Sequence, residues 1–129
     1  MSWSQRLIVL GGAYHLGFAA FHLCFWRLFR WRDELPRLSF LNRQTMQVMN
    51  LCLTTFLLAM AWLSFAHTAE LPASPLGRSL LAAVSLFWFL RMLEQPLFYG
   101  WRTRTSIALT SVFLVGSGLY ALPLLLASR

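Results

Sequence analysis

The sequence predicts an all-α integral membrane protein, an antiparallel bundle of four transmembrane helices. Hydrophobic residues make up 58% of the 129 residues and charged residues only 12%, more apolar surface than a water-soluble core of this size can bury. The apolar residues fall into runs of roughly 20, the length that crosses a hydrocarbon core of about 30 Å at about 1.5 Å per residue. A single transmembrane domain therefore covers residues 1–129.

The apolar runs define four expected helices. They cover about residues 7–26, 46–66, 80–99 and 107–127. The first run begins like a signal peptide, but its one preceding charge, its two histidines and the lack of a convincing cleavage site favour a mature helix. The connectors are short, and Pro36, Pro72 and Pro75 mark turns in the first two. Helices joined this tightly are antiparallel neighbours.

The arginines predict the orientation, because positive side chains are retained on the cytoplasmic side of the inner membrane. The first and third connectors hold seven arginines, and the opposite side holds three, which are Arg6, Arg78 and Arg129. Both termini are therefore expected on the non-cytoplasmic side. The arginine-rich connectors should meet anionic lipid headgroups, with part of the first connector as a short interfacial helix. No basic stripe interleaved with aromatic residues indicates nucleic-acid binding.

Polar side chains inside the runs are the candidates for a ligand or proton pathway, since such groups are costly in hydrocarbon and face protein or water. They are His15, His22, Gln47, Asn50, Arg91 and Glu94. Arg91 and Glu94 are three residues apart and can pair. Antiparallel packing predicts a cluster of these groups in the cytoplasmic half, with His15 deeper. The alternative is that they satisfy one another and hold the helices in register without a ligand.

Cofactors stay unassigned, and no metal site is predicted. Two histidines on one face of a single helix cannot both ligate one haem, and a centre made of His22, Asn50 and Glu94 has no specific spacing. Cys24 and Cys52 are expected to be free thiols. No nucleophile elbow, phosphate loop or HExxH motif occurs, which leaves enzymatic activity open.

Three segments, AYHLGFAAFHLCFW, SFLNRQTMQVMN and SLFWFLRMLEQ, resemble those of a group of small four-helix bacterial integral membrane proteins of uncharacterised activity. The resemblance implies the fold and no activity. The favoured hypothesis is a non-enzymatic membrane protein whose polar cluster binds or passes a proton, ion or small ligand, as a homo-oligomer or a complex subunit. The alternative is a membrane-embedded redox or lipid-modifying enzyme acting on a quinone, haem or lipophilic substrate, with His22 and Glu94 in acid–base roles.

Overall fold

The computed structural model describes residues 1–127, and the predicted all-α class is confirmed for that part of the chain. Its elements are α1 (Trp3–Leu23), α2 (Phe25–Leu28), α3 (Trp31–Glu34), the 3-10 helix η1 (Leu35–Arg37), α4 (Phe40–Ala66), α5 (Glu70–Ala73), α6 (Pro75–Tyr99) and α7 (Arg104–Ala127). They form two compact units, one of residues 12–63 and the other of residues 1–11 with the chain from 64 onward.

Within residues 1–127, three helices are long and apolar enough to cross a membrane: α4, α6 and α7. Only 22–28% of their most apolar stretches is buried inside the protein, so most of their apolar side chains face the surroundings, as expected in lipid. The helix expected at 7–26 is present as α1 but is not among the three. This helix carries Gln5, Arg6, His15 and His22 among its 21 residues. A fourth crossing by α1 stays a prediction.

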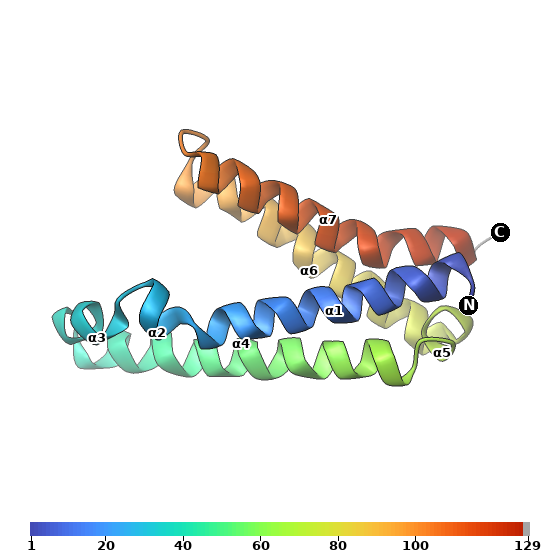
Figure 1. Ribbon diagram of the computed structural model, residues 1–129, viewed down its shortest axis with the longest axis horizontal. Helices are drawn as coiled ribbons and strands as arrows, with labels where there is room; N and C mark the ends of the chain where they lie inside the picture. Colours follow the sequence, from blue (N-terminus) through green and yellow to red (C-terminus); the bar gives the residue numbers. More distant parts are fainter. Residues whose placement is uncertain (128–129) are drawn as a thin grey trace. The chain divides into compact units, whose positions relative to one another are not determined.

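Residues 12–63 fold as a helical hairpin of α1 and α4, which run antiparallel (Figure 1). Between them the chain turns through α2, α3 and η1, where the sequence predicted an interfacial helix. Arg30 adopts the left-handed conformation (φ 49°), a costly one for a side chain with a Cβ, and it separates α2 from α3. Trp31 and Leu35 are buried, whereas Arg27, Arg30, Arg32 and Arg37 are exposed.

The unit containing residue 64 onward is built on an α6–α7 hairpin (Figure 1). Ser74 caps α6 by accepting a hydrogen bond from the backbone N–H of Gly77 (3.0 Å), and Gly100 (φ 72°) ends the helix. Ser85 Oγ donates to the backbone oxygen of Ser117 (3.0 Å), joining α6 to α7 through small polar residues, an arrangement common between membrane helices.

The N-terminal part of α1 and the end of α4 also belong to this second unit. Tyr120 on α7 is 2% exposed, and its hydroxyl lies 2.8 Å from Ser64 Oγ. The ring of Tyr120 lies directly against Gly11, at a position where a Cβ would come within 2.6 Å of Tyr120 Cζ. Gly11, Ser64 and Tyr120 thus form a buried contact among three helices.

Helix starts differ from those predicted. The structure begins α4 at Phe40 and α6 at Pro75, rather than at about residues 46 and 80. Polar residues such as Asn42 and Gln44 continue the helix beyond the apolar run, which hydrophobicity alone does not reveal. Pro96 lies inside α6, which nevertheless continues to Tyr99.

Candidate functional site

A histidine–asparagine pair joins α1 to α4. Asn50 Nδ2 donates to the backbone oxygen of His22 (3.2 Å), and Asn50 Oδ1 lies 2.8 Å from His22 Nδ1. Because the amide nitrogen already donates to the carbonyl, Oδ1 must accept, which makes His22 Nδ1 the protonated nitrogen. A neutral ring in this tautomer carries its lone pair on Nε2. One asparagine thereby sets both the helix register and the tautomer of a half-buried histidine.

Aromatic rings surround this pair. The His22 ring stacks on Phe25, with ring centroids 4.3 Å apart and planes at 27°. Phe25 in turn meets Phe21 (5.1 Å), Phe29 (4.7 Å) and Trp31 (5.6 Å) edge to face. The rings hold the end of α1 against the short helices that follow it. They also place an apolar surrounding next to the imidazole.

Two other candidates in this unit have different surroundings. Gln47 Nε2 donates to the backbone oxygen of Arg43 (3.1 Å), four residues earlier on the same helix. His15 is completely buried (0% exposed), and its ring lies edge to face with Tyr14 at 6.1 Å. His15 is therefore the more enclosed of the two histidines, and its deeper position in the membrane stays a prediction.

A second polar group lies on the α6–α7 hairpin. Arg91 Nη2 donates to Gln95 Oε1 (3.0 Å), and its Cζ lies 4.5 Å from the centre of the Phe113 ring, a cation–π contact. Gln95 is 2% exposed, and its Nε2 donates to Ser106 Oγ (3.5 Å). Ser106 Oγ donates to the backbone oxygen of Gly100 (2.6 Å). These contacts run from the guanidinium to the α6–α7 turn.

The predicted Arg91–Glu94 ion pair does not form in the structure. Glu94 is exposed, and the ion pairs among residues 1–127 are Arg30–Asp33, Arg37–Glu34 and His67–Glu70. On an α-helix one residue turns the side chain by about 100°, so Gln95 faces the protein interior where Glu94 does not. The neutral amide of Gln95, four residues after Arg91, therefore occupies the position expected for the carboxylate of Glu94.

The candidate residues predicted from the sequence therefore fall into two polar groups, one in each unit. His22, Gln47 and Asn50 belong to residues 12–63, and Arg91 and Glu94 to the other unit. Their convergence at one depth stays a prediction. Ser106 and Phe113 were missed, although Gln95 one turn after Arg91 is the signal that leads to them. Within the described part of the chain no three His, Cys, Asp or Glu side chains gather as metal ligands, and the thiols of Cys24 and Cys52 are free and exposed.

Comparisons with family models, with curated proteins and with solved structures found no match to this chain.

Proposed function

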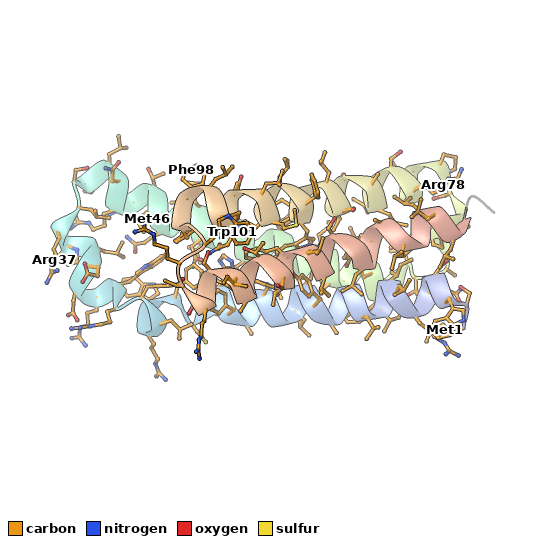
Figure 2. All side chains as sticks on the ribbon, turned by 90° about the horizontal axis from the view of Figure 1, so that it is seen from above. Met1, Arg37, Met46, Arg78, Phe98 and Trp101 are labelled. Carbon is orange, nitrogen blue, oxygen red and sulfur yellow. The ribbon has the colours of Figure 1, made fainter. Side chains whose placement is uncertain are left out.

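We propose that the chain is a four-span protein of the bacterial inner membrane, with α1 as the first crossing and both termini on the non-cytoplasmic side. The 21 residues of α1 make it about 32 Å long, enough to cross the hydrocarbon core. In the α6–α7 hairpin, Arg78 stands at one end of α6, and Phe98 and Trp101 at the other (Figure 2). Arg102 and Arg104 follow Trp101 in the sequence. Aromatic residues next to arginines are typical of the cytoplasmic interface.

A topology reporter tests this orientation. A reporter active only in the cytoplasm, fused to the C-terminus, should be silent, whereas the same reporter inserted between Arg102 and Arg104 should be active. A strong signal from the C-terminal fusion would contradict the orientation and place the arginine-rich connectors outside.

Within this membrane protein, the polar groups of the spans bind or pass a proton, an ion or a small ligand, without enzymatic chemistry, in a homo-oligomer or as a subunit of a larger complex. The contacts of Arg91 inside α6 are the observation that supports this function. An arginine stays protonated in proteins, and a charge inside a membrane helix is costly unless it is compensated. Arg91 lies in the span α6, is half-buried, and has a neutral amide and an aromatic ring as its contacts. A charge held this way suits a ligand-binding role better than a packing role.

The His22–Asn50 pair is the second candidate. Its hydrogen bonds explain a structural role, and an imidazole is also a side chain that can accept and donate protons. His22→Ala should abolish transport or binding in a protein that still folds if the ring is functional. Expression level and unfolding temperature measured beside activity separate the two roles, and a stable, fully active variant would remove His22 from the site.

The first connector supports a lipid partner. It carries five arginines and two carboxylates, and the carboxylates form exposed pairs at 3.1 Å (Arg30–Asp33) and 3.4 Å (Arg37–Glu34), which bind weakly. The connector stays net positive, with Trp26 and Phe29 exposed beside it. Anionic headgroups of the cytoplasmic leaflet are the partner that such a surface attracts.

Reconstitution tests the function. Purified protein in liposomes should show proton or ion flux, or unfold at a higher temperature with an added ligand, and Arg91→Gln should lose the effect while the exposed Arg102→Gln keeps it. Identical behaviour of the wild type and Arg91→Gln would contradict the proposal. A bound chromophore in the optical spectrum, or a stoichiometric metal, would favour the membrane-embedded enzyme instead.

A further inference from the structure

We propose that Arg91 recognises the oxyanion of an amphipathic ligand, a phosphate or carboxylate attached to a body that dissolves in the bilayer. The inference rests on the function proposed for Arg91 and names the chemical class of its ligand.

The guanidinium of Arg91 is held in one orientation. Gln95 Oε1 holds one of its edges through the bond to Nη2, and the Phe113 ring lies over the group at 4.5 Å. Gln95 is itself held by Ser106, so the contact does not depend on a freely rotating side chain. A planar fork fixed at one edge and one face is ready to bind a planar or tetrahedral oxyanion with its other N–H groups.

The positive charge of the Arg91 guanidinium favours an anion as its ligand. The guanidinium has five N–H donors and no acceptor, and the contacts of Arg91 in residues 1–127 include one hydrogen bond and no carboxylate. It repels cations, so a metal ion is not its natural partner. An anion compensates the charge and satisfies the donors at once.

The depth of Arg91 in α6 favours an amphipathic ligand. Arg91 lies eight residues before the end of α6, which is about 12 Å along the helix, and the bond to Gln95 turns its side chain toward that end. The Arg91 side chain therefore meets the oxyanion just below the level of the lipid headgroups. A fully hydrated ion must lose more of its water to reach this depth than the headgroup of an amphiphile does. Phe98, seven residues after Arg91 on the same face of α6, is 81% exposed and offers an apolar surface for an acyl chain.

The test is ligand-dependent thermal unfolding of the full-length protein in a neutral detergent. The probes are phosphatidylglycerol, oleate, dioleoylglycerol and inorganic phosphate. Phosphatidylglycerol or oleate should raise the unfolding temperature saturably, and dioleoylglycerol, which has no oxyanion, should not. Arg91→Gln should raise the half-saturating concentration at least about tenfold, as loss of a charged hydrogen bond implies, and Arg102→Gln should leave it unchanged. Inorganic phosphate acting at the same concentration as the lipids would overturn the amphipathic part of the proposal.

A second variant tests the proposal even if Arg91→Gln fails to fold. Gln95→Glu has the same shape and places a carboxylate against Arg91, so this variant should fold and should no longer respond to oleate or phosphatidylglycerol. An unchanged response would show that the lipids bind elsewhere, for instance at the first connector, and would overturn the inference. Flux or ligand stabilisation that persists in wild-type liposomes without any anionic amphiphile would overturn it too, while leaving the proposed function intact.

Discussion

Adding one methyl group at Gly11 should destabilise the unit formed by residues 1–11 and the chain from 64 onward. A Cβ at Gly11 would lie 2.6 Å from Tyr120 Cζ and 2.7 Å from Tyr120 Oη, whereas ordinary contacts are 3.4–4 Å. The ring must therefore move by roughly 1 Å, a typical overpacking change that costs about 1–3 kcal/mol. That movement also weakens the hydrogen bond to Ser64, worth about 0.6–1.7 kcal/mol between membrane helices.

Alanine favours helix over glycine by at most about 1 kcal/mol, so the net loss for Gly11→Ala should be about 1–3 kcal/mol. The assay is reversible unfolding in mixed micelles with increasing dodecyl sulfate. Gly17→Ala, on the same helix with nothing within 4 Å of its Cβ, is the matched control and should be neutral or stabilising. In a Tyr120→Ala background, which makes room for the methyl group, Gly11→Ala should cost nothing. Equal losses for Gly11→Ala in both backgrounds would refute the reasoning.

Two further substitutions test other parts of the same unit. Gly77→Ala should cost more than Gly11→Ala, because its Cβ would lie 2.6 Å from the Cα of Leu71 and overlap backbone that no rotamer change can move, and a mild effect on unfolding would contradict this close approach. Gln95→Ala should lower stability by about 1.5–3 kcal/mol because it removes the acceptor bound to Arg91, whereas Glu94→Ala should stay within about 0.5 kcal/mol. A larger loss of stability for Glu94→Ala than for Gln95→Ala would contradict this result and support the Arg91–Glu94 ion pair expected from the sequence.

The candidate site shows where residue spacing stops being informative. Sequence reasoning placed His22 and Asn50 at matching depths, and the structure joins them by two hydrogen bonds. The same reasoning paired Arg91 with Glu94, because opposite charges three residues apart can meet on any helix. Which of two neighbouring polar residues faces a partner helix depends on helix rotation, and a rotation of about 100° exchanges Glu94 for Gln95.

By itself the sequence determined the all-α class and the presence of helices long and apolar enough to cross a membrane. Apolar runs of membrane length yield long helices whatever their partners, since a backbone in hydrocarbon must satisfy its own hydrogen bonds. The tertiary structure alone decided which side chains meet. The contact of Gly11 with Tyr120, the bond from Tyr120 to Ser64 and the place of Phe113 over Arg91 join residues far apart in the chain. Such contacts depend on how two helices rotate and slide against each other, and helix packing sets those movements by shape and hydrogen bonding rather than by hydrophobicity.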